Sequence, residues 1–482
     1  MVFTSSVFLF LFLPLILIGY FIAGSRLRNI FLLSASLFFY AWGETGYVLV
    51  IITSIIINYG CGLIIEKGRG KETAWGKTAL FLGLLCNMLL LIYFKYANFL
   101  VANIDILLEK YAVQPFRPDP VHLPIGISFF TFQAISYLVD IYRRESSAQT
   151  NIVNCALYIS LFPQLIAGPI VRYNDIAARL TDRVVTPQLF SYGIQRFIFG
   201  LAKKLIIANH LGEIADKIFA LPHNELTIIT AWLGIICYTL QIYFDFSAYS
   251  DMAIGLGRMF GFKFLENFNY PYIAESVREF WQRWHISLST WFRDYLYIPM
   301  GGSRVSVWRT YFNLCTVFLL CGLWHGASWN FLIWGALHGV YLVAERIGIG
   351  KLLRRLWKPF RYVYTMLLVM TGWVFFRTDD LSHAVQYLSV LVKKSNTGDI
   401  IYSVHMYLNM KVITVLCFAI LLSTPIAKVF GEKCLACLQH TRLKLVQGTV
   451  CAIYYCLLCL LFLISVSCLA AGAYNPFIYF RF

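Results

Sequence analysis

Charged residues are scarce in this chain of 482 residues, where they make up 13% of the sequence while 59% is hydrophobic. Soluble domains carry about 25% charged residues, so this chain has too few to cover a water-facing surface. The composition therefore excludes a soluble globular protein and predicts a polytopic membrane protein embedded in the lipid bilayer. No Lys or Arg precedes the first apolar run, as a secretory signal would require, and we expect that run to be retained as a span.

The signals of several other protein classes are also missing. The net charge of +16 comes from basic residues in short loops between apolar runs, which is the positive-inside pattern, so we expect no nucleic-acid partner. The thirteen cysteines lie mostly inside apolar runs, where they act as small buried hydrophobic residues rather than a disulfide framework. Cys434, Cys437 and His440 lack a second ligand pair, so we expect no metal site.

Apolar runs long enough to cross a bilayer recur along the whole chain. Together with shorter runs, they predict an all-α protein of roughly 10–13 transmembrane or re-entrant helices around a central tunnel. No soluble domain and no internal repeat is evident, so we expect one domain over residues 1–482. The basic loops, from Arg26 and Arg28 to residues 428–444, are expected on the cytoplasmic side, which places both termini outside.

The middle of the chain, residues 244–340, differs from the rest because Trp, Arg, Asp, His and Gly interrupt its apolar runs. Broken backbone at membrane depth is tolerated only where it is buried in protein or lines a water-filled cavity. We therefore expect this core region to line a cavity or tunnel. The segment from Pro163 to Pro169 cannot form a plain helix either, and it predicts a second kinked or re-entrant cavity wall.

Two histidines of this region, His285 and His325, each follow a tryptophan. An ionisable ring is costly inside a membrane and usually has a function. His325 falls at the turn between two half-spans, flanked by Gly322 and Gly326, which permit tight backbone and close approach of a ligand. Burial favours its neutral imidazole, which can act as a general base. The alternative is a packing histidine that is hydrogen-bonded across helices.

Basic residues surround the other histidine. Arg283 and Arg293 bracket His285, and this cluster could hold a donor that carries phosphate or carboxyl groups. Trp281 lies one helical turn before His285, so we expect both on one helix face. An interfacial belt of Trp and Arg side chains that anchors a helix at the lipid headgroups explains the same residues, and both interpretations stay open.

Three further polar residues lie within apolar runs. Asp245 is expected at or inside a span end, where it either lines the cavity or caps a helix. Lys95 lies near a span end and is expected to snorkel to the interface. His338 is expected to be structural, because a helix from His325 would separate the two by about 20 Å.

The chain ends in an aromatic segment, Phe477-Ile-Tyr-Phe-Arg-Phe482. A loose terminus is normally polar and disordered. We therefore expect this tail to be tucked into the protein, and Tyr479 to bring a hydroxyl group with it.

These motifs resemble those of the membrane-bound O-acyltransferase superfamily, and the resemblance runs nearly end to end. It includes Met1-Val-Phe-Thr-Ser-Ser-Val-Phe-Leu-Phe-Leu-Phe-Leu-Pro14, Tyr93-Phe-Lys-Tyr-Ala-Asn98, Leu123-Pro-Ile-Gly-Ile-Ser-Phe129, Tyr243-Phe-Asp-Phe-Ser247, Glu279-Phe-Trp-Gln-Arg-Trp-His-Ile-Ser-Leu-Ser-Thr-Trp-Phe-Arg-Asp-Tyr-Leu-Tyr297 and Gly322-Leu-Trp-His-Gly326. Within the superfamily, the chain looks most similar to the branch that O-acetylates alginate. Branches that act on cellulose or peptidoglycan are the alternatives.

The resemblance implies a helical bundle around a tunnel in the bacterial inner membrane. Such proteins take an acetyl group from a cytoplasmic donor, expected to be acetyl-CoA as a substrate rather than a bound cofactor, and move it outward to a polysaccharide. His325 matches the family's essential histidine, and His285 matches the second histidine of its motifs. Trp324, Arg283, Arg293 and Asp245 are then candidates for contacts with the donor or the tunnel.

The same resemblance implies a route out of the membrane. A tyrosine in a C-terminal aromatic motif, such as Tyr479, is implicated in receiving the acyl group, and an extracytoplasmic hydrolase-like partner protein usually attaches it to the polymer. No Gly-x-Ser-x-Gly elbow is present, so we expect no serine nucleophile of the soluble type. A transporter or flippase for a polysaccharide precursor would explain the broken helices but not the Trp-His pairs, and no inverted repeat supports it.

Overall fold

The computed structural model describes residues 1–68, 73–116, 118–393, 402–440, 444–472 and 474–476. Over this part of the chain every regular element is a helix. The first helices are η1 (Phe8–Phe12), α1 (Leu13–Ile22), α2 (Arg28–Ala41), α3 (Val48–Lys67), α4 (Ala74–Leu91), η2 (Ile92–Tyr96), α5 (Ala97–Lys110), α6 (Ile127–Tyr142), α7 (Ile152–Ser160), α8 (Phe162–Leu165) and α9 (Tyr173–Thr181).

The middle of the chain contains the longest helix and the shortest ones. Its elements are α10 (Pro187–Ala202), η3 (Lys203–Ala208), α11 (Asn209–Phe219), α12 (Ile228–Met259), η4 (Pro271–Ile273), α13 (Val277–Arg283), α14 (Ile286–Phe292), η5 (Arg293–Tyr297), α15 (Val307–His325), α16 (Trp329–Ala344) and η6 (Glu345–Ile349). The remaining elements are α17 (Gly350–Leu353), α18 (Lys358–Arg377), α19 (Leu381–Val392), η7 (Val404–Met406), α20 (Met410–Leu422), α21 (Ile426–His440) and α22 (Lys444–Ala470).

The expected all-α fold of a multi-pass membrane protein is confirmed, although fewer helices than expected are full-length spans. Among the described residues, five helices are long and apolar enough to cross a membrane, at 48–67, 74–110, 228–259, 329–353 and 445–470. A sixth is formed if α20 and the start of α21, which meet at 69°, are one span. Several expected spans are instead shorter apolar helices, such as Phe8–Ile22 and Ile127–Tyr142.

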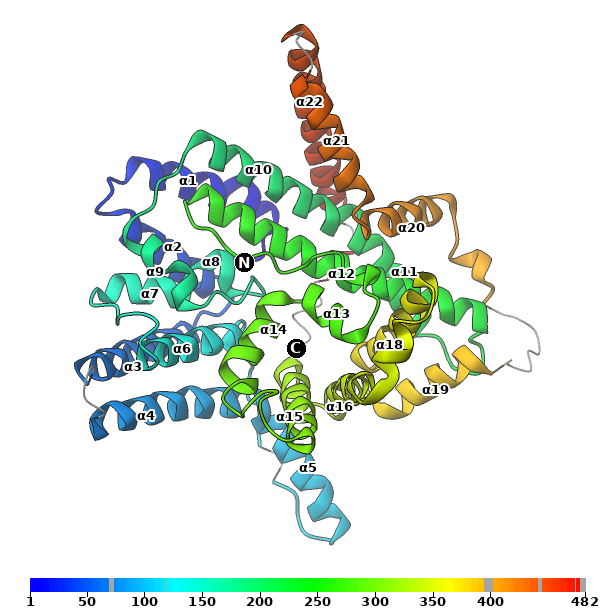
Figure 1. Ribbon diagram of the computed structural model, residues 1–482, viewed down its shortest axis with the longest axis horizontal. Coiled ribbons are helices and arrows are strands. Elements are labelled where there is room, and N and C mark those ends of the chain that lie inside the picture. Colours follow the sequence, from blue (N-terminus) through cyan, green and yellow to red (C-terminus); the bar gives the residue numbers. More distant parts are fainter. Residues whose placement is uncertain (69–72, 117, 394–401, 441–443, 473, 477–482) are drawn as a thin grey trace.

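Helix α12 forms the centre of the molecule, and other helices surround it (Figure 1). In its most apolar stretch 78% of the residues are buried, against 11% in α22. A helix that is hydrophobic all round belongs in a protein core, whereas an exposed apolar helix of a membrane protein faces lipid. Helices α21 and α22 extend away from the body as a pair, while α15 and α16 pack against each other near the centre (Figure 1).

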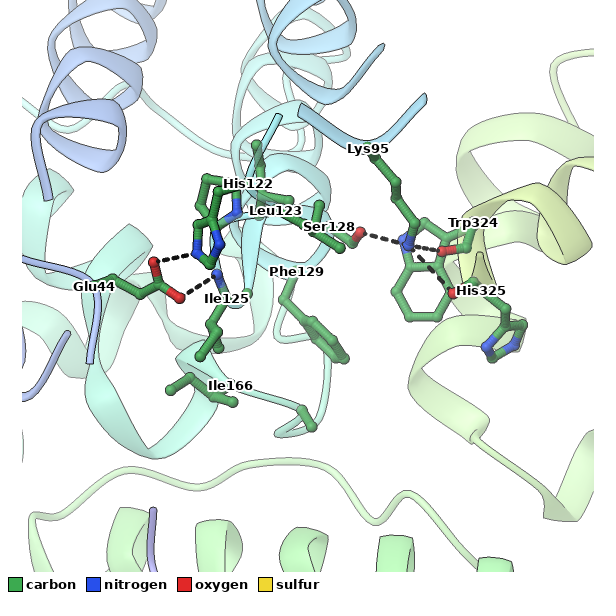
Figure 2. A pocket seen from close by; sticks show the side chains of 14 residues that line it. Glu44, Lys95, His122, Leu123, Ile125, Ser128, Phe129, Ile166, Trp324 and His325 are labelled. Carbon is green, nitrogen blue, oxygen red and sulfur yellow. Dashed lines mark hydrogen bonds and ion pairs between the residues drawn. The ribbon is translucent and has the colours of Figure 1, made fainter. Parts of the chain in front are cut away.

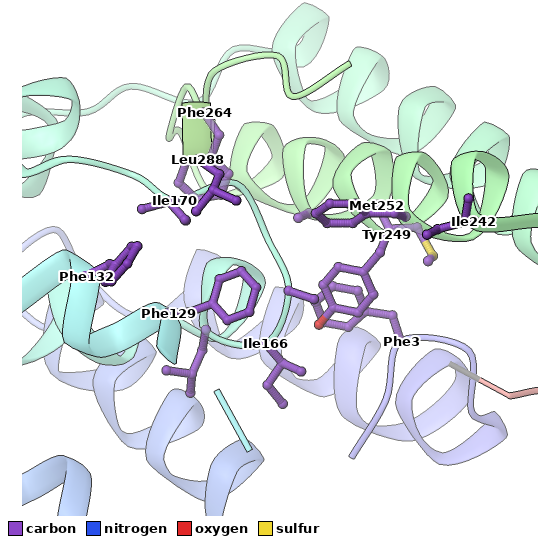
Figure 3. Close-up of a cluster of buried hydrophobic side chains, with 14 of the residues drawn as sticks. Phe3, Phe129, Phe132, Ile166, Ile170, Ile242, Tyr249, Met252, Phe264 and Leu288 are labelled. Carbon is purple, nitrogen blue, oxygen red and sulfur yellow. The ribbon is translucent and has the colours of Figure 1, made fainter. Parts of the chain in front are cut away.

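The core joins segments that are far apart in the sequence (Figure 3). Buried side chains meet there from the N-terminal segment, α6, the segment after α8, α12 and α14; they include Phe3, Phe129, Phe132, Ile166, Ile170, Tyr249, Met252 and Leu288. Because the short helix α14 is fixed in this core, the chain next to it, which carries His285, has a fixed position as well.

Candidate active site

His325 is the last residue of α15, and α16 begins a few residues later, at Trp329. The expected turn between two helices is therefore confirmed. The side chain is 4% exposed, and three aromatic rings meet the imidazole edge-on, with centroids 5.0 Å (Trp324), 4.9 Å (Trp334) and 5.1 Å (Phe376) away. Its Nδ1 is buried and has no hydrogen-bond partner among the described residues.

The glycines around His325 have a different role from the one the sequence suggested. A Cβ atom on Gly322 would lie 2.2 Å from the carbonyl oxygen of Phe331, and one on Gly326 would lie 2.3 Å from the Phe331 ring. The space beside both glycines is thus filled by α16, and the expectation that they admit a ligand was wrong. They allow α15 and α16 to approach closely, as small residues do between membrane helices.

His285 lies in the break between α13 and α14. It is fully buried, and its backbone is left-handed, with φ 42°. Its Nδ1 donates to Oδ1 of Asn267 at 3.2 Å, while Nε2 has no partner in the described part of the chain. The expectation that Trp281 shares a helix face with His285 was wrong, because α13 ends at Arg283 and the chain turns before His285. Trp281 instead donates from Nε1 to Nδ1 of His338, at 3.2 Å.

Trp324 lies between the two histidines. Its ring centroid is 5.0 Å from that of His325 and 6.0 Å from that of His285. The indole is 4% exposed, and its Nε1 has no hydrogen-bond partner among the described residues. The structure thus brings three of the expected site residues together in series.

Lys95 contacts this group, although the sequence placed it at the membrane interface. The side chain is 8% exposed, and its ammonium donates to the carbonyl oxygen of Trp324 and, at 3.1 Å, to Oγ of Ser128 (Figure 2). The expected snorkelling was therefore wrong. The signal that could have found Lys95 is its place inside a long apolar run, where a charge is usually functional.

A cavity of about 340 Å³ reaches His325 from one side (Figure 2). Its polar lining includes Lys95, Glu44 and His122, and Glu44 accepts a hydrogen bond from Nε2 of His122 at 3.0 Å. Ile166 and Ala167 form part of its wall, and Ala167 has a left-handed backbone, with φ 56°. This confirms the kinked cavity wall expected at residues 163–169.

A second cavity, of about 830 Å³, is lined by residues of α13, α14, α15 and the segment after α16. Its arginines outnumber its glutamates; the charged lining consists of Arg278, Arg293, Arg346, Arg354 and Arg361 with Glu275, Glu279 and Glu345. Arg293 therefore lines this cavity, whereas His285, which it was expected to bracket, does not. Arg283 does not line the cavity, because its guanidinium pairs with Glu279 at 2.8 Å and donates to the carbonyl of Asn269.

Asp245 lies in the middle of α12, not at a helix end, so the capping alternative was wrong. Its carboxylate pairs with Lys204 at 2.7 Å, and the two side chains are 1% and 3% exposed. Asp245 also lines a small cavity of about 10 Å³ together with His325, Trp334 and Phe376. The expectation that Asp245 lines a cavity is therefore confirmed.

Tyr479 lies outside the described residues, but the chain just before it is in place. The Tyr474 hydroxyl donates to Asp216, Asn475 accepts from Nδ2 of Asn209 at 3.2 Å, and Lys204 donates to the carbonyl of Pro476. Tyr474 and Pro476 line a cavity of about 190 Å³ that also includes Phe376, one of the rings around His325. Within the described ranges, no group of three His, Cys, Asp or Glu side chains could hold a metal ion.

Comparison with known proteins agrees with this site. The model of the membrane-bound O-acyltransferase family matches residues 37–376, which include both histidines and the two larger cavities. The probable alginate O-acetylase AlgI of Pseudomonas putida is 41% identical over 489 residues, covering 100% of both chains. The protein of the same name from Azotobacter vinelandii is 48% identical over 384 residues, which cover 80% of this chain and 76% of its own.

A relative named for a different activity is also similar over most of its length. The peptidoglycan O-acetyltransferase of Helicobacter pylori is 37% identical over 429 residues, which cover 81% of this chain and 80% of its own. The extent of these matches confirms the resemblance seen in the motifs. The chain belongs to the membrane-bound O-acyltransferase family and is a membrane-embedded O-acyltransferase.

Proposed function

We propose that this protein takes an acetyl group from acetyl-CoA on the cytoplasmic side of the bacterial inner membrane and passes it outward for O-acetylation of alginate. The observation that carries the proposal is the place of His325, which lines the 340 Å³ cavity and lies close to the wall of the basic 830 Å³ cavity. Cys321, one turn before it on α15, lines the basic cavity.

The charges of the two cavities support one side of the membrane for each. Arg346, Arg354 and Arg361 of the larger cavity belong to a basic segment, and such segments stay cytoplasmic. Glu44 of the smaller cavity lies just before α3, a full-length span whose other end carries Lys67. The smaller cavity then opens outward, and this orientation agrees with both termini lying outside.

The basic cavity suits a donor that carries phosphate groups. Arg278, Arg346 and Arg354 line it, and within the described residues none of them forms an ion pair with a carboxylate. Arginine is the preferred partner of phosphate because its planar guanidinium donates two parallel hydrogen bonds. Arg293 lines the same cavity but already pairs with Asp294 at 2.6 Å, so it contributes less to binding of the donor.

His325 then acts as the general base. Its free Nδ1 accepts the proton of the acceptor hydroxyl, whose oxygen attacks the thioester carbonyl carbon. The carbon–sulfur bond breaks, and the proton returns to the thiolate of coenzyme A. Trp324 forms the adjoining wall, and His285, held by Asn267, packs against the Trp324 ring. His285 thereby helps to orient the donor through Trp324.

The route beyond His325 includes the C-terminal tail. We propose Tyr479 as the hydroxyl that receives the acetyl group, because residues 474–476 are bound to the protein beside a cavity that shares Phe376 with the surroundings of His325. An extracytoplasmic hydrolase-like partner would complete the transfer to the polysaccharide. Alginate is favoured by the relatives of higher identity, and peptidoglycan by the relative from Helicobacter pylori.

The test is transfer of radiolabelled acetyl from acetyl-CoA by the purified protein in proteoliposomes. His325→Gln should abolish transfer, while His405→Gln, a change at an exposed histidine, should leave it intact. Tyr479→Phe should block release of label to the outer side while acetyl-CoA remains bound. Full transfer by His325→Gln would disprove the assignment, and export of a precursor without covalent transfer would favour a transporter. Supplying alginate and peptidoglycan fragments in parallel with the partner fraction identifies the acceptor.

A further inference from the structure

Lys95 is a buried cation whose partners are all neutral. Its ammonium donates to the carbonyl oxygens of Trp324 and His325, the latter at 3.4 Å, and to Oγ of Ser128 at 3.1 Å (Figure 2). No carboxylate of a described residue lies within 4.0 Å of it. A charge without a counter-ion at membrane depth is costly. The hydrogen bonds of Lys95 must therefore serve a function that offsets this cost.

The carbonyl groups that Lys95 contacts belong to the C-terminal end of a helix. The last four carbonyls of an α-helix have no partner inside the helix, and in α15 these belong to residues 322–325. The Gly326 amide donates to the Gly322 carbonyl at 3.3 Å, and the Tyr96 hydroxyl donates to that of Leu323 at 2.8 Å. Lys95 supplies the donors for the last two carbonyls.

Two neighbouring side chains thus bind three successive carbonyls of α15. Lys95 and Tyr96 both belong to η2, a π-helical segment between α4 and α5. A π-helical turn is a common device at functional sites because it changes the direction of side chains along a helix. A cation at a helix C-terminus is also favoured by the helix dipole. The ammonium further lies 5.7 Å from the ring centroid of Trp324.

We propose that Lys95 is a positioning residue for the acyl transfer, which caps the broken end of α15 and fixes the backbone that carries Trp324 and His325. This inference rests on the proposed function of His325. All three ammonium protons have a protein partner, so Lys95 holds the turn rather than a substrate. Lys95 lines the outward cavity together with His325, so the cap is also open to a small amine from the outer side.

The test separates positioning from folding. Lys95→Met keeps the hydrocarbon stem and removes all donors, and it should lower kcat by about 10²-fold, the scale expected when a catalytic group shifts by about 1 Å. The KM for acetyl-CoA should stay within about twofold, because the arginines of the donor cavity are untouched. Lys110→Met, at an exposed lysine near the end of α5, is the matched control and should behave as the unchanged protein.

Rescue gives a readout that general damage to the fold would not show. Lys95→Ala leaves room for n-propylamine, which should restore kcat in a saturable manner, while sodium or tetramethylammonium ions at equal ionic strength should not. A wild-type kcat in Lys95→Met, or an amine that restores nothing in a folded Lys95→Ala, would overturn the role. His325→Gln measured in parallel separates the two proposals, because retained transfer there overturns the function of His325 and not the cap.

Discussion

Replacing Lys204 with methionine should destabilise the protein strongly, because it removes one half of an ion pair that lies almost wholly out of water. Lys204 and Asp245 are 2.7 Å apart, and their side chains are 3% and 1% exposed. Removal of one partner of a buried ion pair typically costs about 3–5 kcal/mol. We expect that loss in Lys204→Met, since Asp245 lies in the middle of α12 and cannot move to water.

The double variant Lys204→Met/Asp245→Asn separates this cause from others. With both charges of the pair removed, most of the stability should return, because a buried pair and a neutral replacement are often close in energy. A shortfall of about 1 kcal/mol should remain, since Lys204 also donates to the Pro476 carbonyl. Thermal denaturation of the purified protein in detergent should rank the single variant lowest and place the double variant near wild type.

The neighbouring lysine is the matched control. Lys203 pairs with Asp251 at 2.7 Å but is 30% exposed, and Arg196 holds the same carboxylate at 2.6 Å. Lys203→Met therefore leaves Asp251 paired and should cost little. A wild-type denaturation midpoint for Lys204→Met, or a double variant as unstable as the single one, would refute the reasoning.

Two further variants test the packing around His325 and the proposed donor cavity. Gly322→Ala places a Cβ atom 2.2 Å from the Phe331 carbonyl oxygen, so α15 and α16 must separate. We expect the free energy of unfolding to fall by about 1–3 kcal/mol and acetyl transfer to be lost. Gly348→Ala, at a glycine with open space around it, should be tolerated. The double variant Arg346→Gln/Arg354→Gln should raise the KM for acetyl-CoA and make that KM less dependent on salt concentration. Lys351→Gln, in the same segment, should change neither. An unchanged KM at low ionic strength would contradict the proposed donor cavity.

Much of the fold followed from the apolar runs, but the number of full spans did not. Hydropathy finds segments that avoid water, and it does not separate a helix that crosses the bilayer from a shorter one packed inside the protein. Residues 8–22 and 127–142 form such shorter helices. Helix α6 at 127–142 lies largely in the core, so its apolar character reflects contact with protein rather than with lipid.

The site was partly predictable for a related reason. A histidine between two half-spans is visible in the sequence, and His325 lies at the expected turn between two helices. The partners of these residues come from distant segments, such as Lys95 on η2 and Phe376 on α18. Local patterns carry no information on such contacts, and Trp281 shows that even a helical spacing fails when the helix ends early.

The sequence by itself determined that this chain is a membrane protein and that its centre has broken helices. It also singled out His285 and His325 as ionisable residues in an apolar setting. These conclusions were possible because composition and the cost of burying polar groups act locally. Only the tertiary structure decided what surrounds them. Packing of α15 against α16 placed His325 beside the 340 Å³ cavity and near the basic one, and Lys95 contacts the end of α15. Those roles depend on which helices meet, and that is set by the complementary shapes of surfaces hundreds of residues apart.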